Sequence, residues 1–397
     1  MSGILMMIIA IVVLGGAYLL YGRYLQNKWG IDPNAKTPAY ELEDGVDYVP
    51  ADTNVVFGHQ FASIAGAGPI NGPIQAAIFG WLPVLLWILI GGVFFGAVQD
   101  FASMYASVKN KGRTIGYIIE EYIGKLGKKL FLLFCWLFCI LVVAAFADVV
   151  AGTFNGFATS ESGAVTKVVA NGAVATTSML FIIEAVALGF FLKYSKFNKW
   201  VNTAVAVILL VVAIALGLNF PIYVSLGTWH LIIFAYILIA SVTPVWALLQ
   251  PRDYLNSYLL IFMILGAVIG VFVANPACNL EAFTAFSIPD ANGNPQYMFP
   301  ILFVTIACGA VSGFHSLVSS GTTSKQLDKE TDAKPIAYGG MLLECVLAVL
   351  TLCAIGYAYK WNADIFFLFN HQAVDIFARN EKLLNVLISS IDRLLTQ

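Results

Sequence analysis

Apolar residues gather along the chain in ten long stretches, with most charged residues falling between them. Each stretch approaches the ~20 residues that a helix needs to cross a bilayer. We therefore expect an all-α polytopic membrane protein with about ten transmembrane helices. The predicted spans cover residues 4–22, 57–80, 82–107, 130–154, 176–192, 201–218, 229–249, 254–273, 297–320 and 336–359.

Composition agrees with this pattern. Of the 397 residues, 59% are hydrophobic and 11% are charged, which excludes an ordinary soluble enzyme. The chain divides into a first helix (1–28), a polar loop (29–56), a core (57–359) and an amphipathic tail (360–397). The first helix lacks a basic leader and a clear cleavage site, so we interpret it as retained. We expect the tail to form one or two helices on the membrane surface.

Basic residues orient the predicted spans. With alternating sides and the N-terminus outside, 16 lysines and arginines face the cytoplasm and two face outward. The positive-inside rule favours this orientation. Without a crossing at 57–80, the basic cluster at 109–129 would lie outside, so that segment is expected to cross. Topology and anionic lipid explain the cluster, and no nucleic-acid partner is expected.

The span at 57–80 is unsuited to a regular helix. Its middle contains three glycines and two prolines within eight residues, at positions 66–73. In a helix interior glycine costs roughly 1 kcal/mol and proline roughly 3 kcal/mol. Backbone groups freed in lipid need partners, so such breaks occur inside protein or beside a wet cavity, and in transporters they mark the binding site. The alternative is a proline-kinked helix with small residues for close packing.

A second interrupted span lies at 229–249, where Ser241, Thr243 and Pro244 fall late in the apolar run. It comes five spans after the first break and runs the opposite way across the membrane. Paired breaks of this kind predict an inverted-repeat, LeuT-like bundle. We place the substrate near mid-membrane, between residues 66–73 and 241–244.

Carboxylates inside the predicted spans are costly and often functional. They are Asp100, Asp148, Glu184 and Glu344. Asp148 and Glu184 could instead be interfacial or helix-packing groups. Asp100 could anchor the basic loop at 109–113.

Several long blocks closely resemble the carbon starvation protein A (CstA) family. They are FGHQFASIAGAGPINGP at 57–73, GAVQDF at 96–101, GAVSGFHSLVSSGTTSKQL at 309–327, ETDA at 330–333 and YGGMLLE at 338–344. The resemblance covers roughly residues 1 to 355. It implies a bacterial inner-membrane secondary transporter, associated with peptide uptake during carbon starvation, with some relatives carrying pyruvate. The segment from 360 does not look like the family, whose members usually continue with further membrane helices. We therefore expect a chain that lacks the usual C-terminal part.

Candidate site residues follow from the breaks and from the resemblance. Freed N–H groups and side-chain amides suit a peptide, so the substrate-binding candidates are His59, Gln60, Gly66, Gly68, Asn71, Gln75, Ser241 and Thr243. Buried charges, the family motif and analogy with sodium sites on related folds give the ion- or proton-coupling candidates Asp100, Asp148, His315, Ser319, Ser320 and Thr322. The histidines lack metal-ligand spacing, so no metal site is expected. No cofactor is expected beyond a coupling H⁺ or Na⁺.

The leading function is therefore uptake of small peptides by a secondary transporter. A pyruvate or small-carboxylate symporter and a non-transporting metabolite sensor are the alternatives. An enzyme is disfavoured because the chain carries no His-Glu-x-x-His, Walker or Gly-x-Ser-x-Gly motif. The expected partners are the solute and the lipid bilayer, and the sequence leaves the oligomeric state open.

Overall fold

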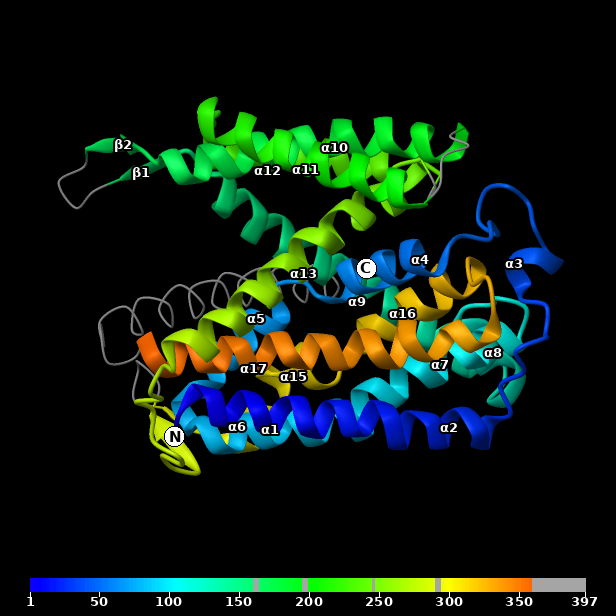
Figure 1. Ribbon diagram of the computed structural model, residues 1–397, viewed down its shortest axis with the longest axis horizontal. Helices are drawn as coiled ribbons and strands as arrows, with labels where there is room; N and C mark the ends of the chain where they lie inside the picture. The colour runs from blue at the N-terminus through cyan, green and yellow to red at the C-terminus, as the bar shows by residue number, and fades with distance from the viewer. Residues whose placement is uncertain (160–163, 195–198, 245–246, 290–293, 359–397) are drawn as a thin grey trace, which may run out of the picture.

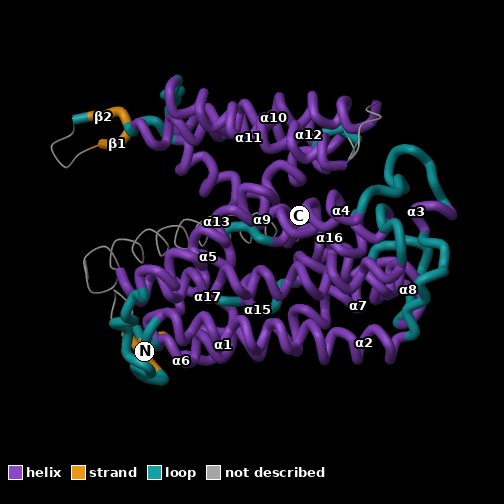
Figure 2. The backbone as a smooth tube through the Cα atoms, viewed as in Figure 1, coloured by secondary structure: helices purple, strands orange, loops and turns teal. Residues whose placement is uncertain are grey.

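Helices dominate the part of the chain that the structure describes. In the computed structural model the described residues are 1–159, 164–194, 199–244, 247–289 and 294–358, so the tail predicted at 360–397 lies outside them. Two short antiparallel hairpins accompany the helices in these ranges, β1 (Phe157–Thr159) with β2 (Val165–Lys167) and β3 (Ser287–Pro289) with β4 (Pro295–Tyr297) (Figure 2). The all-α prediction is confirmed.

Within the described ranges, seven helices are long and apolar enough to cross a membrane. They span Gly3–Trp29, Trp81–Lys109, Lys125–Phe154, Val169–Phe191, Val201–Asn219, Leu249–Ala274 and Glu330–Tyr357. The shorter apolar helix α12 (Leu226–Val242) stands between the fifth and sixth of these. The remaining predicted spans are interrupted. One is divided into α4 (Thr53–Ile64) and α5 (Gly68–Ala76), and the other into α14 (Met298–Thr305), α15 (Ala307–Ala310) and α16 (Gly313–Gly321).

Three of the long helices carry a wide π-helical turn, and these turns meet. They separate α1 (Gly3–Gly16) from α2 (Gly22–Trp29) and α6 (Trp81–Gly91) from α7 (Ala97–Lys109), and they precede α17 (Gly340–Ala358). The Tyr338 hydroxyl donates to the Val93 carbonyl at 3.4 Å, and the Tyr21 and Phe94 rings lie 5.3 Å apart. Wide turns of this kind often occur at functional sites.

The long helices form two groups (Figure 1). The main bundle contains α1, α4 to α7 and α14 to α17. The second group is a layer of α10 (Val169–Tyr194), α11 (Lys199–Asn219) and α12, reached through α9 (Lys125–Phe154). Helix α13 (Leu249–Ala274) joins the groups because it packs against both α4 and α10.

Hydrogen bonds tie the loops together at each end of the main bundle. At one end, Gly3 N–H donates to Pro276 O, Cys278 N–H to Met1 O, and Trp81 N–H to Glu281 O. The opposite end contains α3 (Pro38–Glu41) and α8 (Ile115–Tyr122). There, bonds join residues 32–51 to residues 326–330. Loops predicted on the same side of the membrane therefore contact one another.

Helix α17 forms the centre of the main bundle. Most residues between Met341 and Cys353 of α17 are buried, whereas in α9 burial is confined to Ala151 and Phe154. Helix α17 packs against α1, α4, α5 and α6. A polar side chain on α17 is therefore enclosed by protein.

Candidate functional site

The interrupted segment α4–α5 crosses the main bundle beside α17. The Asp52 carboxylate begins α4 by accepting the Asn54 N–H at 2.9 Å, and regular helix stops at Ile64. Helix α5 starts at Gly68 with Pro69 in its first turn, where a missing N–H costs nothing. The break therefore covers residues 65–67, at the start of the glycine- and proline-rich stretch.

The glycines in the break and just after it have two different environments. A Cβ atom on Gly68 would lie 2.2 Å from the Cys308 Cβ, and one on Gly72 would lie 2.5 Å from the Thr305 carbonyl oxygen. A Cβ atom on Gly66 would meet nothing within 4 Å. Gly68 and Gly72 thus permit close packing of α5 on α14 and α15, whereas Gly66 faces open space.

The segment that faces this break is α14–α16. The backbone leaves the helical conformation at Val311 and Ser312, and α16 begins again at Gly313. The Ser312 carbonyl accepts the Gln99 side-chain amide at 2.9 Å. A Cβ atom on Gly309 would lie 3.5 Å from the Pro69 Cα, so the two interrupted segments are in direct contact.

Ser241 and Thr243 lie elsewhere. Both are at the end of α12, and their hydroxyls donate to the carbonyls of Leu238 and Ile239 in the same helix. Ser241 is exposed, and α12 packs against α9. The structure therefore does not bring this pair to the α4–α5 break as we had expected, because a position five spans away in chain order need not be a neighbour in space.

Among the substrate candidates on α4 and α5, Asn71 is exposed and Gln75 is half-buried. Gln60 is fully buried and bonded on both ends of its amide. It donates to the Ser319 hydroxyl at 2.9 Å and accepts from the Thr323 hydroxyl at 2.5 Å. Gln60 and Ser319 were predicted for different roles, and the structure joins them as a tie between α4 and α16.

His59 belongs to a buried charged cluster. Its Nδ1 lies 2.8 Å from the Asp253 carboxylate, which also accepts from the Ser63 hydroxyl at 3.3 Å. The Arg252 guanidinium holds the other carboxylate oxygen at 2.9 and 2.7 Å, and it reaches the Tyr236 hydroxyl. The His59 Nε2 has no hydrogen-bond partner among the described residues. Sequence reasoning missed Asp253 and treated Arg252 only as an inner-side charge, although adjacent opposite charges at the mouth of an apolar span were a usable signal.

A second buried cluster lies between α7, α16 and α17. His315 Nδ1 lies 3.0 Å from Asp100 Oδ2, and His315 Nε2 lies 3.4 Å from Glu344 Oε2. All three side chains are at most 1% exposed. Two sequence candidates are thus brought together, with Glu344 as a third member that the sequence had marked only as a carboxylate inside a span.

The other coupling candidates occupy separate places. Asp148, on α9, lies 3.1 Å from His230 on α12, and both side chains are about two-fifths exposed. The Ser320 hydroxyl donates to the Ser316 carbonyl and accepts the Ile115 N–H. Thr322 is half-buried where α16 ends. Among the described residues, none of these side chains forms a hydrogen bond to the Asp100, His315 and Glu344 cluster.

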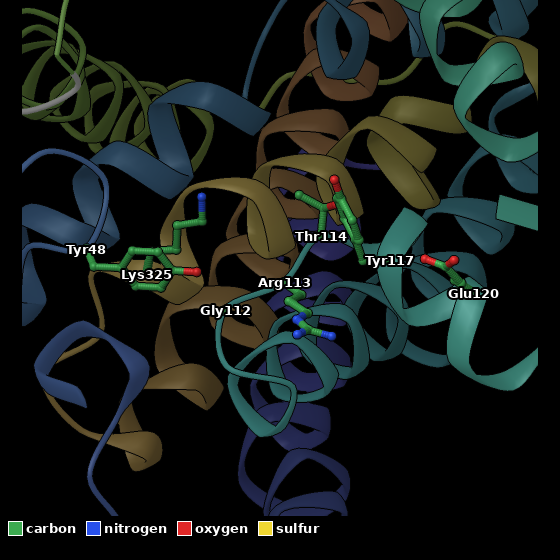
Figure 3. A pocket seen from close by; sticks show the side chains of 7 residues that line it. All are labelled: Tyr48, Gly112, Arg113, Thr114, Tyr117, Glu120 and Lys325. Atoms are coloured by element: carbon green, nitrogen blue, oxygen red, sulfur yellow. The ribbon is translucent and has the colours of Figure 1, made fainter. Parts of the chain in front are cut away.

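A pocket of about 440 Å³ lies away from the break, at the end of the bundle that holds α8 (Figure 3). It is lined by Tyr48, Gly112, Arg113, Thr114, Tyr117, Glu120 and Lys325. Glu120 binds Lys128 at 2.5 Å, and Lys325 pairs with Asp47 at 3.4 Å. Most charges at this pocket are therefore already matched, and the sequence had not singled it out.

Membrane-length helices, two interrupted segments in contact and buried charged clusters together define a polytopic membrane protein with a polar interior. The family model for carbon starvation protein CstA matches residues 2–393, and the chain belongs to this family. The match extends over most of the segment beyond 360, where we had expected a departure from the family. Its spaced leucines and isoleucines are less distinctive than the glycine-rich blocks.

Named relatives agree with the family. The chain is 37% identical over 352 residues to the peptide transporter CstA of Escherichia coli strain K12, covering 85% of this chain and 47% of that protein. It is 37% identical over 379 residues to the peptide transporter CstA of Bacillus subtilis strain 168, covering 89% of this chain and 58% of that protein. It is 39% identical over 351 residues to the pyruvate/proton symporter BtsT of E. coli strain K12, covering 85% and 47%.

The chain spans about half the length of these relatives. No solved structure shows significant similarity to it.

Proposed function

We propose that this chain takes up small peptides across the bacterial inner membrane as a secondary transporter. The observation that carries the proposal is the contact between two interrupted segments, α4–α5 and α14–α16, inside one bundle. Lipid cannot satisfy interrupted backbone, so such breaks occur where protein lines a cavity. The peptide transporter names of the relatives support the substrate class.

The proposed topology has ten crossings with the N-terminus outside. The seven long helices, α12 and the two interrupted segments supply the ten. Bonds between loops at each end of the bundle support the alternation of sides. We retain an inverted, LeuT-like repeat as part of this proposal, with the end of α12 as the counterpart in chain order of the α4–α5 break.

The proposed substrate site lies on the side of the two breaks where Gly66 and Gly313 face open space. Asn71, in the first turns of α5, is exposed. The half-helices α5 and α16 begin at Gly68 and Gly313, and the positive ends of their dipoles suit a carboxylate. The amide of Asn71 and the unpartnered Nε2 of His59 suit the polar backbone of a peptide.

A small carboxylate such as pyruvate is the second candidate substrate. A relative at 39% identity is named a pyruvate/proton symporter, and pyruvate shares the carboxylate but lacks the ammonium and amide groups of a peptide. A metabolite sensor without transport remains the competing class. Uptake measurements separate all three.

The test is uptake of radiolabelled dialanine and pyruvate by proteoliposomes containing the chain, with competition by a small peptide panel. Peptide uptake that pyruvate does not compete supports the proposal, and uptake of pyruvate alone favours the alternative. Binding without uptake would indicate a sensor. Asn71→Ala should weaken apparent affinity by about 1–3 kcal/mol, the effect of one lost polar contact, whereas Leu209→Ala on α11 should not change it. Wild-type affinity in Asn71→Ala would place the substrate elsewhere.

A further inference from the structure

The cluster of Asp100, His315 and Glu344 contains two carboxyl groups but only one side chain, the His315 imidazole, that can carry a positive charge. Each residue comes from a different helix, and each is at most 1% exposed. Among the described residues, neither carboxylate pairs with a lysine or arginine. The other titratable neighbours are the thiols of Cys308 on α15 and Cys345 on α17.

The number of protons that the cluster binds follows from this charge balance. With both carboxylates ionised and the imidazole neutral, the cluster would carry a charge of −2. Protein without nearby countercharge does not hold such a charge, so the enclosed cluster is neutral only after binding two protons. One arrangement is imidazolium beside one carboxylate and one carboxylic acid. The buried site thus requires protons that solvent must supply or remove.

We infer that Asp100, His315 and Glu344 form the proton-binding site that couples transport to a pH gradient. This inference rests on the proposed function. A relative is named a pyruvate/proton symporter, and the new element is the placement of the coupling proton on these three residues, with Glu344 added to the candidates.

Geometry favours a proton over Na⁺ or another metal ion. The carboxylates stand at opposite nitrogens of one imidazole, so the three side chains do not converge on a common point. Hard cations bind several oxygen ligands. An imidazole between two carboxylates instead allows a proton relay.

The relay can be written as a balanced step. The relay operates after one of the two protons has left the cluster, so that Glu344 is a carboxylic acid, Asp100 is a carboxylate and the His315 imidazole is neutral with its proton on Nδ1. A proton then leaves the Glu344 carboxylic acid for His315 Nε2, while the proton on Nδ1 passes to the Asp100 carboxylate. The imidazole changes tautomer, Glu344 becomes ionised and Asp100 becomes neutral. One proton has crossed from α17 to α7 without changing the charge of the cluster.

Unmet hydrogen-bonding capacity also sets this cluster apart from a purely structural tie. Asp100 Oδ1, His315 Nε2 and both oxygens of Glu344 are buried without hydrogen-bond partners among the described residues. The Gln60 tie to Ser319 and Thr323, by contrast, uses both ends of its amide. Buried polar atoms left unpaired are expensive unless the site serves another purpose.

The cluster is physically linked to the proposed substrate break. His315 lies two residues after Gly313, where α16 restarts. Cys308, on the preceding α15, packs directly against Gly68 of α5. A substrate that shifts α5 against residues 308–315 would therefore move His315 relative to Asp100 and Glu344.

Transport by proteoliposomes tests the inference. One coupled proton should give about tenfold accumulation for each unit of pH difference, because both correspond to the same free energy. We expect wild type to accumulate its substrate, probed with dialanine and with pyruvate, when the outside is more acidic. Glu344→Gln and Asp100→Asn should exchange labelled for unlabelled substrate across the membrane but should not accumulate it. Glu184→Gln, a carboxylate on α10 outside the cluster, should accumulate like wild type.

Several results would overturn the proton site. They are wild-type accumulation in both cluster variants, accumulation driven by a sodium gradient alone, or loss of exchange together with accumulation in both variants. If wild type neither accumulates nor exchanges either probe, the proposed function fails instead.

Infrared spectroscopy then decides the proton site independently of transport. The wild-type spectrum at neutral pH should contain the carbonyl band of a protonated carboxylic acid that Glu344→Gln or Asp100→Asn removes. A spectrum unchanged in both variants would refute the assignment.

Discussion

Replacing Gly72 with alanine should separate two helices that now touch. The added Cβ would lie 2.5 Å from the Thr305 carbonyl oxygen and 3.1 Å from the Ile306 Cα. Ordinary contact begins at 3.4 Å, so the oxygen would have to move by 0.9 Å, the difference between 3.4 and 2.5 Å. Both neighbours are backbone atoms and cannot rotate away. Overpacking of this kind costs about 1–3 kcal/mol, or about 5- to 150-fold in the ratio of folded to unfolded protein.

Unfolding by sodium dodecyl sulfate, followed by circular dichroism of the purified protein in mild detergent, measures this cost. Gly66→Ala is the matched control because its Cβ would meet nothing within 4 Å. It should change the free energy of unfolding by less than about 0.5 kcal/mol. Equal midpoints for Gly72→Ala and Gly66→Ala would refute the packing argument. By the same reasoning Gly68→Leu reports on helix packing against Cys308 and not on a substrate pocket.

Three further outcomes are expected. Single cysteines at Lys167 and Lys329, in a chain freed of its six native cysteines, should label from opposite sides of the membrane, and labelling from one side would contradict the topology. Asp253→Asn removes a buried ion-pair partner and should lower the free energy of unfolding by about 3–5 kcal/mol in the same detergent titration, and an unchanged midpoint would contradict the ion-pair role. The pKa of Asp44 is lowered because its carboxylate accepts N–H groups of residues 46–48. These hydrogen bonds therefore stabilise the loop fully above the unfolded-state pKa, and the stabilisation is lost as pH falls through the lowered pKa. The protection factors of those amides, which correct for the slower intrinsic exchange at low pH, should fall in acid, and the same fall in Asp44→Asn would contradict the carboxylate's role.

Local features of the fold were predictable because local chemistry determines them. The glycines and prolines at 66–73 predicted an interruption, and helix indeed stops at Ile64. The prediction placed the break too late. Proline is favourable in a first helical turn, so Pro69 helps begin α5 and only residues 65–67 are irregular.

Spatial pairings were less accessible to sequence reasoning. Asp100 and His315 were each recognised as unusual polar residues within a span, but 215 positions separate them along the chain. Only the packing of α7, α16 and α17 brings them to Glu344. Ser241 illustrates the opposite error, since repeat symmetry in chain order suggested a neighbour that the three-dimensional arrangement does not provide.

The N-terminus has a consequence for biosynthesis. Ser2 pairs with Ala277, and the Met1 carbonyl accepts the Cys278 N–H, so 275 residues separate the partners of the first contact. At about 5–20 residues per second, a ribosome needs roughly 15–55 s to reach the second partner. During that interval the first helix must stay in the bilayer through its own hydrophobicity, and its amino end acquires its fixed position only after most of the other helices have been made.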